Sequence, residues 1–400
     1  MFLNLEVCII QKLIKSVIKS TDALVKKYKF TRWMEPLVKE ADLFFFSSTE
    51  RSQGYCKVRD CTDYKRMMIM VVFALLPTLL WGIYNCGFQI NRMYSEVLHY
   101  NDGIRLFILQ SLSLQIDPDS VLSCFVMGCL YFVPMYVVGL VVGGLIEVAF
   151  SVVRKTSINE GFLVTSLIFP MILPCGIELW KVALGIAFGV IFGKEVFGGT
   201  GKNIFNPALV GRIFLFFAFP ASMSGDVWLD GTSGATYLSG PTNLDDINFL
   251  SLFLGDKFGC IGETSSCMCL LGGVFLLFTK IASWRIVVSS LLSLGIFSYI
   301  FELLSFTQIP WYHQFVVGGA LFGIFFMATD PVTSSYTKIG KYIYGTIIGT
   351  LIVVIRIFNP GFPEGVMFSI LIGNALAPLI DQIILSMMIR RRDKKLRSYT

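Results

Sequence analysis

Two apolar runs of equal length decide the fold of this chain: GFLVTSLIFPMILP at residues 161–174 and GGALFGIFFMATDP at residues 318–331. Each begins with Gly and ends with Pro, and each is followed by a Gly-spaced helical stretch that ends in Phe-Asn-Pro, at 205–207 and 358–360. Short helices bounded by Gly and Pro at matching places are typical of membrane proteins with an internal repeat, and they mark the binding site there. The alternative is chance resemblance between Phe-rich membrane helices.

The repeat predicts two halves that cross the membrane in opposite directions. Apolar runs predict helices near residues 67–90, 121–150, 160–174, 180–197, 207–220, 260–280, 284–302, 313–330, 341–358 and 365–389. Five spans per half is an odd number, so the second half would enter from the opposite side of the bilayer. The predicted fold class is an all-α polytopic membrane protein with about ten transmembrane helices in two inverted five-helix repeats with short broken helices.

Composition agrees with a membrane protein. Of the 400 residues, 54% are hydrophobic and only 15% are charged, which is more apolar surface than a water-soluble shell can enclose. The first 66 residues differ, because they hold 13 of the 33 Lys and Arg and no run of about 18 apolar residues. We expect them to form a basic cytoplasmic extension, in which residues 2–14 form an amphipathic surface helix rather than a signal peptide.

Charge in the connections predicts which side each one faces. Basic residues gather at Arg154, Lys155, Lys194, Lys202, Lys280, Arg285, Lys338, Lys341 and the tail 390–400. By the positive-inside rule these segments face the cytoplasm, and so do both termini. Residues 221–259 hold five Asp against the single Lys257 and should form an outer loop. The expected membrane repeats are therefore 67–220 and 260–389.

Several kinds of site are excluded. The ten Cys include no Cys-x2-Cys pair, which argues against a zinc ribbon or a self-contained iron–sulfur motif. The chain has only two His, His99 and His313, which argues against a haem or a His-rich metal site. A Gly-x-Gly-x-x-Gly motif for NADH is also absent, and nothing points to nucleic acid.

The outer loop contains Ser233-Gly234-Ala235-Thr236. Its small neighbours leave the Thr236 hydroxyl uncrowded, so this hydroxyl could be a covalent attachment point. A solvated turn built from Gly, Ser and Thr is the alternative.

A second constellation belongs to the cytoplasmic side. Gly139, Gly143, Gly144 and Glu147 share one helix face, against which a flat ring could lie. Close Gly-xxx-Gly helix packing, with Glu147 reaching toward water, would explain the same pattern.

Polar residues flank the short helices on that same side. The amides of Asn203 and Asn206 at a broken helix start suit a neutral heterocycle or a polyol chain. Thr165 and Asp330 lie at corresponding ends of the two short runs, where they could meet the same ligand. Asp381 stands alone in an apolar run, and such a carboxylate is a candidate proton or cation contact.

These residues carry a resemblance to a known family, the B subunits of sodium-translocating NADH:quinone oxidoreductases. The resemblance spans nearly the whole chain beyond about residue 28. It rests on KRMM at 65–68, GGTGKN at 198–203, NPA at 206–208, FPAxMSGD at 219–226, SGAT at 233–236, GETS at 262–265 and ATDP at 328–331. The D subunits of Rnf electron-transport complexes are related, but the long N-terminal extension resembles the quinone reductase.

The resemblance implies cofactors and roles. FMN is expected in a phosphoester with Thr236, placed there by a flavin transferase, within the motif Ser233, Gly234 and Ala235. A noncovalent riboflavin is expected at Thr165, Asn203, Asn206 and Asp330, and ubiquinone reduction at Gly143, Gly144 and Glu147, with Glu147 as the catalytic residue. Asp381 matches an acidic position linked with sodium uptake.

The resemblance also implies partner subunits, among them an NADH-oxidising flavin and iron–sulfur subunit and a second FMN subunit. Two sites on opposite sides of the bilayer would let electrons cross inward between two flavins. Binding a flavin would fix its spacing and surroundings, while the redox chemistry belongs to the ring. A channel or facilitator for a small polar solute fits an inverted repeat equally well, and the colour of the purified protein would separate the two.

Overall fold

The fold was obtained as a computed structural model, which describes residues 64–96, 103–112, 115–154, 161–223, 227–229, 232–233, 249–307, 309–359 and 365–397. Helices dominate these ranges. The two short strands within them, β1 (Val227–Leu229) and β2 (Thr232–Ser233), form one antiparallel pair in the loop between the two halves. The prediction of a helical membrane protein is confirmed.

Helices of the first half follow one another in chain order. They are α3 (Tyr64–Glu96), α4 (Gly103–Ser111), α5 (Val121–Arg154), α6 (Gly161–Met171), α7 (Leu179–Val190), the π-helical turn η2 (Ile191–Glu195), α8 (Pro207–Ala218) and α9 (Pro220–Met223). The second half follows the two strands. It contains α10 (Phe249–Leu254), the 3-10 turn η4 (Ile261–Glu263), α11 (Ser266–Phe278), α12 (Trp284–Leu303), α13 (His313–Val316), α14 (Ala320–Phe322), the π-helical turn η5 (Gly323–Met327), α15 (Lys338–Phe358) and α16 (Val366–Arg397).

Each of the ten predicted apolar helices has a counterpart in the structure. The run at 313–330 is broken, because α13 ends at Val316 and α14 begins only after Gly319, whose φ is +64°. Left-handed backbone of this kind suits glycine. The short helix α4 does not follow from the sequence, since its nine residues are too few to stand out as a span.

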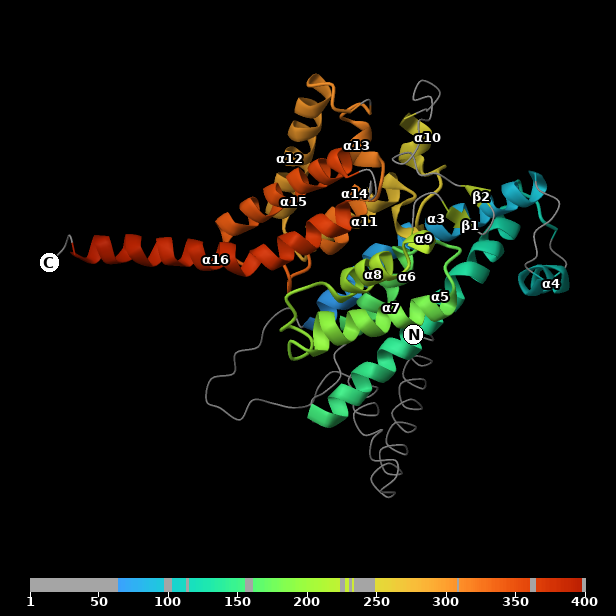
Figure 1. The fold of residues 1–400 in the computed structure, drawn as a ribbon, viewed down its shortest axis with the longest axis horizontal. Helices are drawn as coiled ribbons and strands as arrows, with labels where there is room; N and C mark the ends of the chain where they lie inside the picture. Colours follow the sequence, from blue (N-terminus) through green and yellow to red (C-terminus); the bar gives the residue numbers. More distant parts are fainter. Residues whose placement is uncertain are drawn as a thin grey trace, which may run out of the picture.

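Within the described part of the chain, five helices are long and apolar enough to cross a membrane. They lie at Arg66–Met93, Val121–Arg154, Trp284–Leu303, Lys338–Phe358 and Val366–Lys395. Three shorter apolar helices, α6, α8 and α11, accompany them. Figure 1 shows α16 extending well beyond the rest of the molecule toward the C-terminus.

The two halves of the chain use matching sets of neighbours. In the first half α7 packs between α5 and α8, and in the second half α15 packs between α12 and α16. Helix α3 contacts α5 and α6 of its own half as well as α11 of the other, so it joins the two groups seen in Figure 1. This arrangement follows the order of the predicted five-helix repeats.

Small residues bring the neighbouring helices close together. On α15, a Cβ added to Gly345 would lie 2.0 Å from Ser289 Oγ of α12, and one added to Gly349 would lie 2.1 Å from Ser293 Oγ. Membrane helices associate through such close packing, because lipid supplies no hydrophobic drive between them.

Candidate functional site

A cavity lies where the two short runs of the repeat meet. Apolar side chains, among them Met68, Val71, Leu276 and Phe326, form much of its wall. Among the described residues, seven polar ones also line it: Thr165, Lys194, Thr200, Asn203, Asn206, Thr329 and Asp330. An apolar wall that carries a few polar groups is typical of a small-molecule site.

The four residues expected to contact one ligand all line this cavity. Thr165 belongs to the first turns of α6, whereas Asp330 follows the end of η5. The beginning of one short run therefore meets the end of the other, which is the arrangement expected of an inverted repeat. Asn203 and Asn206 come from the loop that connects η2 with α8.

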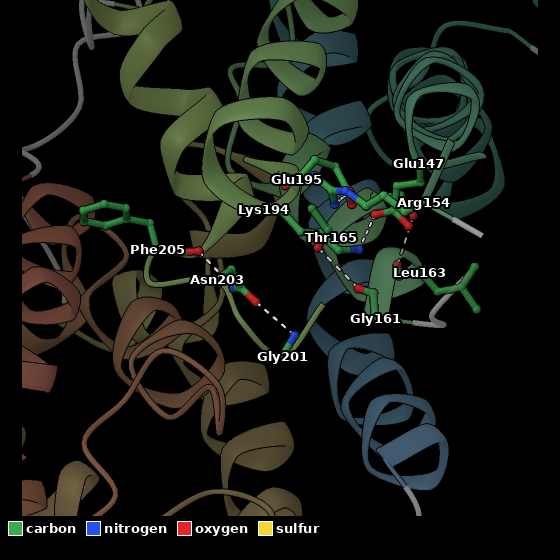
Figure 2. Close-up of polar contacts among 11 residues, drawn as sticks. Glu147, Arg154, Gly161, Leu163, Thr165, Lys194, Glu195, Gly201, Asn203 and Phe205 are labelled. Carbon is green, nitrogen blue, oxygen red and sulfur yellow. Dashed lines mark hydrogen bonds and ion pairs between the residues drawn. The ribbon is translucent and has the colours of Figure 1, made fainter. Parts of the chain in front are cut away.

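The loop from η2 to α8 depends on glycine. Gly198, Gly199 and Gly201 have φ values of +115°, +93° and +86°. A residue with a side chain would be strained in this backbone conformation. Within this loop, Asn203 donates from Nδ2 to the Phe205 carbonyl at 3.0 Å and accepts from the Gly201 amide at 3.3 Å (Figure 2). The Asn203 side chain is thus held in place at the cavity wall.

Asn206 has two roles. Its Oδ1 accepts from the Ala208 amide at 3.0 Å and so caps the N-terminus of α8, where unpaired backbone N–H groups need acceptors. Among the residues that the structure describes, we find no acceptor for the Asn206 Nδ2. This amide nitrogen is the donor that Asn206 can offer to a ligand.

Thr165 and Asp330 add a hydroxyl and a carboxylate. The Thr165 hydroxyl donates to the Gly161 carbonyl at 3.3 Å, which leaves its oxygen able to accept. Asp330 accepts from the Val332 amide at 3.2 Å and from the Thr333 hydroxyl at 3.1 Å. The cavity thus combines donors and acceptors suited to a ligand with several polar atoms.

Two ion pairs join α5 to the π-helical turn η2 beside the cavity. Glu147 pairs with Lys194, and their exposed fractions are only 5% and 3%. Arg154 pairs with Glu195 at 2.7 Å and also donates to the Glu195 carbonyl at 2.5 Å. Figure 2 shows both pairs next to Thr165. Lys194 lines the cavity, and Glu147 contacts Lys194 from behind the cavity wall.

The glycine face of α5 is covered by an aromatic ring. A Cβ added to Gly143 would lie 2.6 Å from the Phe162 ring of α6 and 3.1 Å from Ile186 of α7, while one added to Gly144 would lie 3.5 Å from Phe162. Gly143 thus serves close packing, the alternative raised for this pattern. Gly144 has ordinary van der Waals room and is partly exposed.

Asp381 lies apart from the cavity. Its carboxylate accepts from the Ser335 hydroxyl at 2.7 Å, the Tyr336 amide at 2.8 Å and both the amide and the hydroxyl of Thr337. These bonds tie α16 to the start of α15 and compensate the charge. The structure therefore gives this isolated carboxylate four donors from the protein.

The Ser-Gly-Ala-Thr motif at residues 233–236 is described only at its first residue. Gly234, Ala235 and Thr236 lie outside the described residues, and of Ser233 only the backbone, in β2, is described. The end of that loop is described: Lys257 and Asp256 bond to Asn85 and Gln89 of α3. Val71 of the same helix lines the cavity, fourteen residues before Asn85, or about 21 Å at 1.5 Å per residue. The loop's end and the cavity thus lie toward opposite ends of α3.

Reasoning from the sequence did not predict two residues of the site, Lys194 and Glu195. The sequence pattern marks Lys194 only as a cation in a cytoplasmic connection and does not single out Glu195. A signal exists, because Lys194 and Glu195 end an apolar helix while Glu147 and Arg154 end another. Oppositely charged residues at the ends of two neighbouring apolar helices favour pairing between them.

Comparison with known proteins gives consistent results. The model of the NQR2, RnfD, RnfE family matches residues 52–390. The chain is 45% identical over 382 residues to the B subunit of the Na(+)-translocating NADH-quinone reductase of Pseudomonas paraeruginosa, covering 91% of this chain and 94% of that protein. The B subunits of the same name from Azotobacter vinelandii (46% over 383 residues; 91% and 94% covered) and Yersinia pestis (45% over 386 residues; 89% and 93% covered) are similarly close.

Proposed function

The chain belongs to the NQR2, RnfD, RnfE family, and from this premise we propose that it is the membrane-embedded B subunit of a bacterial sodium-translocating NADH:quinone reductase. Relatives that carry this name match nine-tenths of the chain, which favours this assignment over the D subunit of an Rnf-type complex. The remaining subunits would include an NADH-oxidising flavin and iron–sulfur subunit and a second FMN subunit.

One observation carries the proposal of a noncovalent riboflavin. Thr165, Asn203, Asn206 and Asp330 come from three separate segments, and all four line one cavity. The donor set fits the group, since amides, a hydroxyl and a carboxylate can bind the ring nitrogens, the carbonyls and the polyol chain of riboflavin, while the apolar wall accepts the flat ring. When bound, the flavin supplies one- and two-electron transfer.

Ubiquinone is proposed to bind beside Glu147, at the end of the Gly143 and Gly144 face. In the described structure Phe162 lies over this face, so the quinone head is proposed to approach on the side of Gly144 and Glu147. The Glu147 carboxylate can accept a hydrogen bond or hold a proton there, and its pairing with Lys194 keeps it oriented.

The remaining elements complete the proposal. FMN is attached to Thr236 on the outer side by a flavin transferase, so that electrons pass inward from the outer flavin to riboflavin and quinone. Asp381 is proposed as a contact on the sodium path. A cation that binds there must compete with the four hydrogen bonds the carboxylate already accepts.

Flavin analysis of the purified chain tests the proposal. After acid precipitation, riboflavin should appear in the supernatant and FMN should stay with the protein pellet. A colourless preparation from flavin-sufficient cells would contradict the redox function and favour a facilitator for a small polar solute.

A substitution separates the two flavins. Thr236→Val keeps the shape of the side chain but removes the hydroxyl, so the denatured gel band should lose its flavin fluorescence while acid-released riboflavin stays. Thr242→Val in the same loop is the matched control and should keep both signals. A fluorescent Thr236→Val band would assign the attachment to another residue.

A further inference from the structure

Lys194 stands between the cavity and Glu147. Its side chain lines the cavity, and its ammonium group donates to the Glu147 carboxylate on α5 (Figure 2). Both residues are buried, and Lys194 is the basic side chain among the described residues that line this cavity. A positive charge is therefore fixed in the wall of the site and held there by a residue outside it.

The local backbone places Lys194 there. The end of α7 changes into the π-helical turn η2, and π-helical turns inside α-helices occur frequently at functional sites. In η2, the neighbours Lys194 and Glu195 pair with two residues of the same helix, Glu147 and Arg154. Gly193 lets this turn lie against the start of α8, because its Cβ would be 2.9 Å from Pro207.

Stability alone does not account for the Glu147–Lys194 pair. The Arg154–Glu195 pair already joins α5 to η2. Removing two charges from water is expensive, so a fully buried ion pair is often no more stabilising than apolar residues of the same volume. A second, fully buried pair at the edge of a ligand cavity therefore points to a role toward the ligand.

We propose that Lys194 is a positioning residue that supplies a fixed positive charge to the cavity and thereby raises the reduction potential of the flavin bound there. The inference rests on the proposed riboflavin site and adds a residue to it. Reduction adds electrons to the ring, and a cation nearby in a medium of low dielectric constant favours the electron-rich form. Glu147 holds the ammonium in place and balances its charge from the far side.

The test is a redox titration of the acid-releasable flavin in the purified whole complex, followed by absorbance. Lys194→Met removes the charge and keeps an unbranched side chain. We expect the equilibrium constant for two-electron reduction to fall about tenfold, which is a shift of about 30 mV to more negative potential. Lys194→Arg keeps the charge and should stay near the wild-type potential.

Two further variants separate charge from structure. Lys194→Met leaves Glu147 buried and unpaired, which can prevent folding. The double variant Lys194→Met with Glu147→Gln avoids this problem, because it removes both charges. We expect its flavin potential to be lower than that of the wild type as well. Glu195→Gln is the matched control, because it weakens the other ion pair between the same two elements but removes a negative charge, so it should not lower the potential.

The outcomes separate a charge effect from a structural one. An unchanged potential in the double variant, with normal flavin content, would show that Lys194 has only a structural role and would overturn the inference. An equal downward shift in Glu195→Gln would also overturn it. If the wild-type complex releases no noncovalent flavin at all, the riboflavin site itself is wrong, and the inference falls with it. A lower potential in the two Met variants alone would support the role of Lys194.

Discussion

Asp381 on α16 accepts hydrogen bonds from both the amide and the hydroxyl of Thr337, at 3.0 and 2.6 Å, and so fastens α16 to the residue that caps α15. The Thr337 hydroxyl oxygen also accepts from the Gly340 amide at 3.1 Å in the first turn of α15. A carboxylate at the beginning of a helix interacts favourably with the unpaired N–H groups there. This contact explains how an isolated acidic residue is accommodated in an apolar helix.

The first prediction concerns this contact. Asp381→Asn replaces one acceptor oxygen by an NH2 group that faces donors, so at least one of the four bonds is lost. We expect the folded state to lose about 1–3 kcal/mol, measured as a lower thermal unfolding midpoint of the purified protein. Asp393→Asn, at an exposed position of the same helix, is the control. Unchanged unfolding together with a lost sodium dependence of turnover would instead assign Asp381 to the ion path alone.

The second prediction separates the two roles of Asn206. Asp caps a helix as well as Asn does, so Asn206→Asp should keep α8 intact while it removes the Nδ2 donor from the cavity. We expect about fivefold to tenfold weaker retention of the noncovalent flavin, the effect of one lost hydrogen bond. Acid-released flavin per mole of protein measures it.

Asn359 provides the matched control for that experiment. It belongs to the second Phe-Asn-Pro tripeptide, at the end of α15, and does not line the cavity. Asn359→Asp should retain flavin like the wild type. If Asn206→Asp also retains it fully, the Asn206 amide is not a ligand contact.

Much of the fold could be predicted because membrane helices leave a strong local signal. A run of apolar residues predicts a helix wherever it occurs, and the paired short runs predict that Thr165 and Asp330 come together, as they do. Local patterns carry no comparable information about α4, whose nine residues resemble a loop between spans.

What could not be predicted depends on contacts between distant segments. Phe162 covers Gly143, and Thr337 bonds to Asp381 forty-four residues later. Neither contact follows from the composition of its own helix. The π-helical turn at Lys194 could not be predicted either, because the apolar run does not show where one extra residue enters a helical turn.

The third prediction concerns the glycine face of α5. Gly143→Ala would press a methyl group against the buried ring of Phe162, at 2.6 Å, and should destabilise the fold by about 1–3 kcal/mol. Gly144→Ala has 3.5 Å of room and should leave thermal unfolding unchanged. If the quinone lies on this side, the methyl group added by Gly144→Ala should still lower quinone turnover about tenfold.

Comparing the two variants distinguishes packing from binding. Gly144→Ala is informative because its effect on stability and its effect on turnover have different origins. Normal quinone turnover in a stable Gly144→Ala protein would remove this face from the quinone site. Loss of flavin in the same variant would show a disturbance of the neighbouring cavity instead.

The last prediction concerns sidedness, on which the inward electron path depends. Lys194, Ile281 and Asp330 line one cavity, so the basic connections that contain or adjoin them lie at one end of the molecule. The acidic loop 221–259 ends near the opposite end of α3. A single cysteine in place of Asp230 should therefore react with a membrane-impermeant maleimide in intact cells. A cysteine in place of Lys338, which is exposed at the start of α15, should react only in opened cells.

The cysteine-depleted parent is the control, and it must keep its flavin, because Cys86 and Cys175 are buried in the core and their removal can disturb packing. Labelling of Lys338→Cys from outside, with Asp230→Cys protected, would show that the topology is the reverse of the one proposed, and the inward electron path would then be wrong. Protection at both positions would indicate coverage by partner subunits. Labelling of intact cells that make this chain without its partner subunits then decides the sidedness, because no partner covers either cysteine.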